Sequence, residues 1–204
     1  MSNQTVRVWD PLVRIFHWGL VVAVAVAWLS SEGWDDLHAI AGYVMIGLLA
    51  VRLIWGMVGS RYARFTQFLR APKAVIAYLR DLAARRERRY IGHNPAGGVM
   101  ILVLMLTLAG TGWTGWLLED PTRLAALPDM PQIIAPAHAG EHGGEGEGEG
   151  GLIGDLHEVL ANFGLLLIGL HLGGVVLASL RHRENLARAM VTGDKRAPEA
   201  GDVA

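Results

Sequence analysis

Histidine is the residue whose type and position in this 204-residue chain suggest chemistry. The chain has eight histidines and no cysteine, which excludes disulfides, thiolate iron–sulfur clusters, cysteine zinc sites and covalently attached haem. Imidazole and carboxylate groups then remain as the strong metal ligands. An ionisable side chain is costly inside a bilayer, so a histidine within a long apolar stretch indicates a functional site. Four histidines lie in such stretches: His17, His38, His157 and His171.

The apolar stretches around these histidines are long enough to cross a membrane. Apolar residues make up 52% of the chain and charged residues 18%, which is typical of a membrane protein rather than a soluble domain. A bilayer core about 30 Å thick requires roughly 20 helical residues. We therefore predict an all-α fold, an integral membrane four-helix bundle, with spans at about 12–31, 37–59, 95–118 and 156–180.

Polar residues before the apolar stretches predict where the four helices begin. Such residues cap the free backbone N–H groups of a first turn, and proline is favoured as the first helical residue. The predicted signals are Asp10-Pro11, Asp35-Asp36, Asn94-Pro95 and a capping box formed by Asp155 and Glu158.

The basic residues are distributed unevenly between the two sides of the predicted bundle. Two lie before or early in the first span, nine lie in residues 60–93 and five follow the fourth span. The other two connections contain only Arg123, against eleven carboxylates. By the positive-inside rule, both termini, the basic loop 60–93 and the tail 181–204 are cytoplasmic, and the acidic, glycine-rich loop 119–154 is periplasmic.

The four membrane histidines fall into two pairs by depth. His157 and His171 are fourteen residues apart, which places them about 21 Å apart along one helix and within about 40° of the same direction. His157 is level with His38 near the outer surface, and His171 approaches the level of His17. Two imidazoles at each of two levels are what two bis-histidine haem b groups require, with His17 and His171 on the inner iron and His38 and His157 on the outer iron. The alternative is that these histidines are hydrogen-bonded packing residues.

Arg52 and His93 are further candidates at the inner level. Arg52 follows His38 by fourteen residues, and no carboxylate in the spans is available to neutralise it, so a haem propionate is a natural partner. The alternative is that Arg52 extends to the cytoplasmic surface. His93 precedes the third span, where it binds a propionate or a quinone head, or is simply an interfacial loop residue.

The remaining segments carry weaker signals. Residues 72–89 space apolar residues at helical intervals among basic ones, which suits a helix on anionic headgroups or a solvated basic helix. Residues 124–151 are rich in Pro, Gly and Glu and are expected to be flexible. Within them, His138 and His142 form at best a labile metal site. No nucleophile triad, phosphate loop or nucleic-acid-binding patch is present in the sequence.

Several short motifs together carry a resemblance to a known family. They are Val8-Trp9-Asp10-Pro11, His17-Trp18, Arg52-Leu53-Ile54-Trp55-Gly56, Gly92-His93-Asn94-Pro95-Ala96-Gly97-Gly98, Leu156-His157-Glu158, His182-Arg183-Glu184-Asn185-Leu186 and Met190-Val191-Thr192-Gly193-Asp194-Lys195-Arg196. The chain resembles the bacterial di-haem cytochrome b family of the prokaryotic cytochrome b561 type, which is similar to the b subunits of nickel–iron hydrogenases. The resemblance implies a four-helix membrane bundle in the bacterial inner membrane, with haem ligands at the four paired histidines.

The resemblance also implies a function. One end exchanges electrons with the quinone pool, and the other with a redox partner such as a periplasmic c-type cytochrome or a dehydrogenase subunit of a respiratory chain. Whether the chain is an enzyme or an electron-transfer subunit stays open. One alternative is a superoxide oxidase that passes electrons to ubiquinone, although eleven outer carboxylates disfavour an anionic substrate. Another is a haem-free metal or proton transporter that uses the histidines as a relay.

Overall fold

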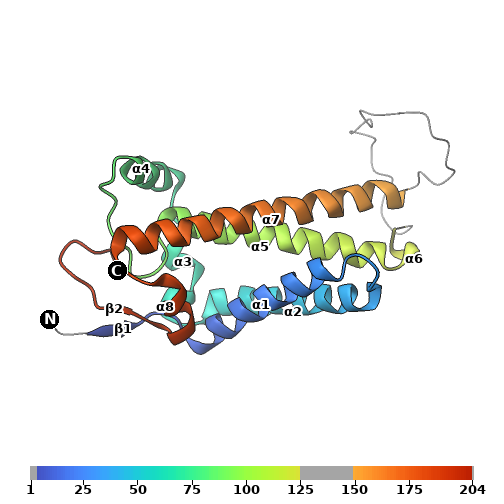
Figure 1. Ribbon diagram of the computed structural model, residues 1–204, viewed down its shortest axis with the longest axis horizontal. Helices are drawn as coiled ribbons and strands as arrows, with labels where there is room; N and C mark the ends of the chain where they lie inside the picture. The colour runs from blue at the N-terminus through green and yellow to red at the C-terminus, as the bar shows by residue number, and fades with distance from the viewer. Residues whose placement is uncertain (1–3, 125–148, 204) are drawn as a thin grey trace.

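Four long helices run side by side in the computed structural model, which describes residues 4–124 and 149–203 (Figure 1). They are α1 (Pro11–Leu29), α2 (Asp35–Val58), α5 (Pro95–Leu118) and α7 (Glu149–His182). Each is long and apolar enough to cross a membrane. The predicted all-α membrane bundle of four transmembrane helices is therefore confirmed. The predictions for the outer loop, including His138 and His142, concern residues outside the described ranges.

The short elements gather mainly at one end of the bundle, where both termini also lie (Figure 1). They are β1 (Thr5–Arg7), η1 (Arg61–Ala63), α3 (Phe65–Phe68), α4 (Pro72–Ala83), α8 (Leu186–Thr192) and β2 (Asp194–Arg196). We call this the basic end, because residues 4–14, 60–93 and 181–203 contain sixteen of the eighteen Lys and Arg residues. The opposite end holds the α1–α2 connection and α6 (Pro121–Leu124), and we call it the acidic end.

Two of the four predicted helix starts have the expected caps. The Asp10 carboxylate accepts from Val13 N at 2.9 Å, and the Asn94 side chain accepts from Gly97 N at 2.7 Å. The prediction for α2 was wrong in detail, because Asp35 and Asp36 lie inside its first turn. There their charges are stabilised by the helix dipole.

The predicted capping box at the start of the fourth span was also wrong. Helix α7 begins at Glu149, so Asp155 and Glu158 lie well inside the helix. Ile153, in the added turn, is only 4% exposed. Burial of this apolar side chain favours continuing the helix ahead of the polar pair, where a cap is not needed.

The long helices pack as two close pairs, α1 with α2 and α5 with α7, which are joined through a contact between α2 and α5. A buried cluster fills the space among α1, α2 and α5, and its members are Phe16, Ala23, Met45, Leu49, Met105 and Leu108. Among the described residues, α7 does not pack closely against α1 or α2. Helices α1 and α2 carry the histidines that are predicted to pair with those of α7, and neither helix packs closely against α7.

The two ends of the chain are tied together beside the start of α1. Strands β1 and β2 form an antiparallel pair, and the carbonyl of Gly193 accepts from Val8 N and Trp9 N at 2.9 and 3.0 Å. Gly193 adopts a positive φ of 89°, and a Cβ here would lie 2.6 Å from the Trp9 carbonyl oxygen. Only glycine suits both the conformation and the close approach. This contact fixes the entry to α1, and with it the position of His17 two turns later.

Asp10 then links the start of α1 to the end of α2. Besides capping α1, its carboxylate accepts hydrogen bonds from Trp55 Nε1 at 3.1 Å and from the Ser60 hydroxyl. Burial alone would raise the pKa of Asp10, but the hydrogen bonds from Ser60, Val13 and Trp55 outweigh it and lower the pKa. The ionised carboxylate therefore acts as a fixed joint between the first two spans.

Candidate functional site

His38 and His157 face each other in the half of the bundle nearest the acidic end. His38 comes from the first turns of α2 and His157 from α7, and their ring centroids are 6.1 Å apart with planes at 67°. Metal–nitrogen bonds of histidine sites are about 2.0 Å long, so two imidazoles on opposite sides of one metal have centroids roughly 6 Å apart. The separation of these rings therefore suits a shared metal between them.

Both rings of this outer pair have one nitrogen occupied by a hydrogen bond. His38 Nδ1 lies 2.8 Å from the Ala27 carbonyl oxygen, which can only accept, so Nδ1 donates. His157 Nδ1 lies 2.9 Å from the Thr114 hydroxyl, which itself donates to the carbonyls of Gly110 or Thr111 at 3.0 Å and so accepts from the ring. In each ring, Nε2 is then the unprotonated nitrogen that can bind iron.

Glycines give the histidine helices room. A Cβ at Gly115 would stand 3.1 Å from His157 Cε1, so this glycine lets α5 approach the ring closely. At Gly42 and Gly174, which follow His38 and His171 by four and three residues, no described atom outside the local helix backbone lies within 4 Å of a Cβ position. The space beside these two glycines suits the bulk of a porphyrin.

The inner pair, His17 on α1 and His171 on α7, lies in the half of the bundle nearest the basic end. His17 packs against Trp18 at a centroid distance of 5.2 Å, and its Nδ1 is buried with no hydrogen-bond partner in the described protein. A buried polar nitrogen without a partner costs free energy, so the site fits an additional bound group.

Arg52 is buried at this level rather than extended to the surface. Its exposed fraction is 3%, its Nη2 donates to the Ala63 carbonyl at 3.0 Å, and its guanidinium lies 5.0 Å from the centre of the Phe65 ring. Arg52 Nη1 has no partner, and within residues 4–124 and 149–203 no carboxylate oxygen lies within 4.0 Å of the side chain. A buried cation without a counter-ion is unfavourable, so Arg52 is suited to bind an anionic group.

His93 lies between the rings of Trp9 and Phe68, at centroid distances of 4.6 and 4.8 Å. Its Nδ1 is buried and has no partner. Burial lowers the pKa of His93 to about 3, and the nearby positive charges of Arg52 and Lys195 add to the shift. The ring is therefore neutral at physiological pH, and it can donate one hydrogen bond and accept another.

Several buried nitrogens without hydrogen-bond partners belong to residues near the basic end of the bundle. Among the described residues, five buried side-chain atoms lack a hydrogen-bond partner, and four are nitrogens: Arg14 Nε, His17 Nδ1, Arg52 Nη1 and His93 Nδ1. A set of donors with two guanidinium groups fits an anionic group such as a haem propionate. Arg14 was missed as a site residue from the sequence, where it counted toward the orientation of the first span and toward the family resemblance.

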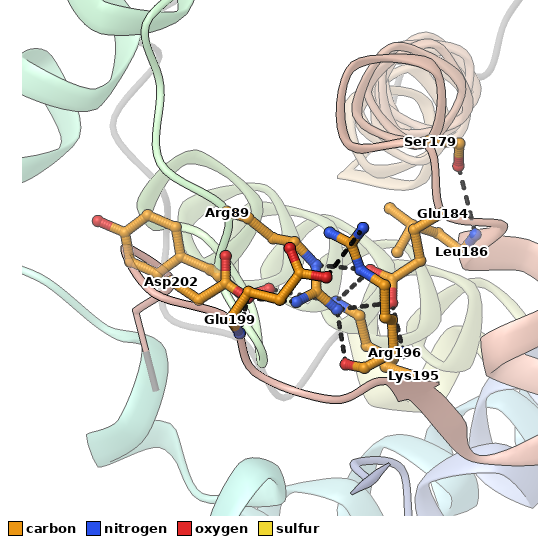
Figure 2. Close-up of polar contacts among 9 residues, drawn as sticks. Arg89, Ser179, Glu184, Leu186, Lys195, Arg196, Glu199 and Asp202 are labelled. Carbon is orange, nitrogen blue, oxygen red and sulfur yellow. Dashed lines mark hydrogen bonds and ion pairs between the residues drawn. The ribbon is translucent and has the colours of Figure 1, made fainter. Parts of the chain in front are cut away.

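A buried ionic cluster supports the loop that carries His93 (Figure 2). Arg89, whose side chain is 5% exposed, pairs with Glu184 at 2.7 Å and with Asp202 at 2.5 Å. Lys195 Nζ lies 3.5 Å from Glu184 and donates to the Tyr90 carbonyl at 3.2 Å. Burial raises the pKa of Glu184, but the hydrogen bonds from Arg89 and the charge of Lys195 outweigh it and hold the pKa below its ordinary value. The cluster thus fastens residues 89–90 to the chain beyond α7.

Four apolar spans with paired histidines and a donor-rich inner site define a membrane-bound b-type cytochrome as the class of protein. The family model described as prokaryotic cytochrome b561 matches residues 8–193, and the chain belongs to this family. No curated protein and no solved structure gives a significant match. Membership means that the chain binds haem b and transfers electrons across a membrane.

Proposed function

We propose that the chain binds two haem b groups, one between His17 and His171 and one between His38 and His157. The observation that carries the proposal is the outer pair, with centroids 6.1 Å apart and both Nδ1 atoms engaged in hydrogen bonds. Haem b supplies one-electron exchange at its iron. An iron held between two such imidazoles would have no open position for a further ligand, so the residues favour electron transfer over ligand chemistry at the metal.

The inner residues hold the anionic edge of the cofactor in this proposal. Arg14, Arg52 and His93 offer three buried nitrogens without protein partners, and the guanidinium groups can each form a bidentate contact with a carboxylate. The two sites are separated by fourteen residues of α7, or about 21 Å along the helix axis. Electrons therefore pass between the two sides of the membrane within one chain.

We infer that the basic end faces the cytoplasm of a bacterium, with both termini inside, and that the acidic end faces the periplasm. One end exchanges electrons with membrane quinone. At the acidic end, Glu32, Asp35 and Asp36 are all exposed in or next to the α1–α2 connection, close in sequence to the ligand His38. Negative charge here attracts a basic redox partner, such as a periplasmic c-type cytochrome or a dehydrogenase subunit, and repels superoxide.

Electron transfer in proteoliposomes tests this function. Ubiquinol or menaquinol analogues should reduce the haem, and a basic c-type cytochrome on the outer face should reoxidise it at a rate that falls with ionic strength. The variant Asp35→Asn/Asp36→Asn should slow the second step, whereas the control Asp81→Asn/Glu199→Gln, at the other end, should not. Failure of both quinols to reduce the haem would contradict the quinone link. Faster reduction by superoxide than by quinol would favour a superoxide oxidase.

A further inference from the structure

Helix α4 is attached to the side of the basic end, next to the ends of α5 and α7 (Figure 1). Tyr78 is 7% exposed, and its ring contacts Tyr90 at a centroid distance of 5.8 Å. The Leu82 carbonyl accepts a hydrogen bond from Arg181 at 3.5 Å. These contacts fix which side of α4 faces the bundle, and they leave the opposite side and both flanks uncovered.

The uncovered surface of α4 includes large apolar side chains. Ile76 is 51% exposed and Leu79, three residues later, is 47% exposed, so the two lie next to each other on the helix surface. Leu69, shortly before the helix, is 39% exposed. Apolar groups of this size are unfavourable in water, which indicates that something covers them.

Basic side chains border this apolar surface. Lys73 and Arg80 are seven residues apart, so they point within about 20° of each other, and Ile76 lies between them. Arg70 is also exposed. In the described part of the chain, none of these three has a carboxylate within 4.0 Å. The acidic residue of α4, Asp81, is engaged by Arg86 at 3.3 Å instead.

We propose that α4 lies on the membrane surface and binds anionic phospholipid headgroups. Lys73, Arg80 and Arg70 contact the phosphates, while Ile76 and Leu79 reach the acyl region below them. A lipid surface is favoured over a protein partner because the four spans place α4 beside the bilayer, and because apolar residues bordered by unpaired cations match an anionic interface. The proposal does not depend on the number of haems or on the redox partners.

Site-directed spin labelling tests which face of α4 meets the lipid. The chain contains no cysteine, so Ile76→Cys and Ala74→Cys each give one labelled site on the full, haem-loaded protein. Position 74 lies about 200° around the helix from position 76 and serves as the matched control. In vesicles containing phosphatidylglycerol, the label at 76 should collide with oxygen more than with an aqueous nickel chelate, and the label at 74 should show the reverse. Preference for the nickel chelate at both sites, or shielding of position 76 from both reagents by protein, would overturn the proposal.

Charge removal tests the preference for anionic lipid. Each basic residue near an anionic surface contributes about fivefold to affinity, so Lys73→Gln/Arg80→Gln should lower the preference for phosphatidylglycerol over phosphatidylcholine by roughly 25-fold. The control Arg61→Gln/Arg188→Gln removes the same charge from exposed positions outside α4. It should lower the preference for phosphatidylglycerol much less. Equal losses in the two double variants, or no loss in the first, would refute specific binding by α4.

Discussion

Replacing Thr114 by valine removes one hydrogen bond behind a proposed iron ligand and almost nothing else. Thr114 is 3% exposed, and its hydroxyl accepts from His157 Nδ1 at 2.9 Å. Valine keeps the shape of threonine. The Gly110 and Thr111 carbonyls that lose the hydroxyl donor still take part in the backbone hydrogen bonds of α5. The main effect therefore falls on the imidazole of His157.

A hydrogen bond to Nδ1–H makes an imidazole a stronger electron donor and favours the oxidised metal. The net value of such a bond is about 0.5–1.5 kcal/mol, which corresponds to about 20–65 mV for a one-electron couple. Thr114→Val should therefore raise the outer haem potential by an amount in this range.

A redox titration followed at the haem absorption bands measures this shift, with the two haems resolved as separate components. The inner potential should stay unchanged. Thr107→Val is the matched control, because Thr107 is also buried in α5 but forms no hydrogen bond with a histidine in the described structure. An unchanged outer potential, or an equal shift of both haems, would refute the assignment of Thr114 as the partner of His157.

Three other substitutions give independent predictions. Arg52→Ala removes a buried cation without a carboxylate partner and should lower the inner haem potential by roughly several tens of millivolts; an unchanged titration would contradict the propionate contact. Gly56→Ala would place a Cβ 2.1 Å from Phe65 Cε2, so thermal unfolding should show a loss of about 1–3 kcal/mol from overpacking, and a wild-type transition would show that Phe65 moves freely. Arg89→Ala removes the cation that pairs with both Glu184 and Asp202, leaving Lys195 as the remaining basic partner of Glu184, and should cost about 3 kcal/mol at neutral pH. Both carboxyl pKa values are lowered in the fold, so the stability that the two carboxylates confer is present above pH 4.5 and is lost as the pH falls through the lowered pKa values. The difference in the free energy of unfolding between wild type and Arg89→Ala should therefore be present at neutral pH and disappear in acid.

The membrane helices, and the facing of His38 and His157, were predictable because their signals lie along the sequence. Span length, the position of charges and a spacing of fourteen residues between His157 and His171 are one-dimensional quantities. The proposal that Arg52 is a buried cation also followed from its position in an apolar stretch. The start of α7 was less predictable, since capping residues compete with the burial of Ile153.

The supporting groups could not be found from the sequence because contacts between distant segments create them. Thr114 is one of several threonines in its span, and only the packing of α5 on α7 brings it to His157, 43 residues away. The Ala27 carbonyl, which accepts from His38 Nδ1, is a backbone group, so the residue type at this position gives no sign of its role. Arg89 and Asp202 are separated by 113 residues, and their pairing depends on the return of the chain past the end of α7.

Counting the haem groups tests the central claim most directly. A pyridine haemochrome determination and a reduced-minus-oxidised spectrum would be measured on purified wild type, His17→Ala and His38→Ala, with gel filtration to confirm folding. The paired histidines predict two low-spin b haems per wild-type chain and one in each variant, with the inner haem lost from the first and the outer haem lost from the second. A folded wild type with no haem or a single haem, or a His38→Ala protein that retains both, would contradict the account.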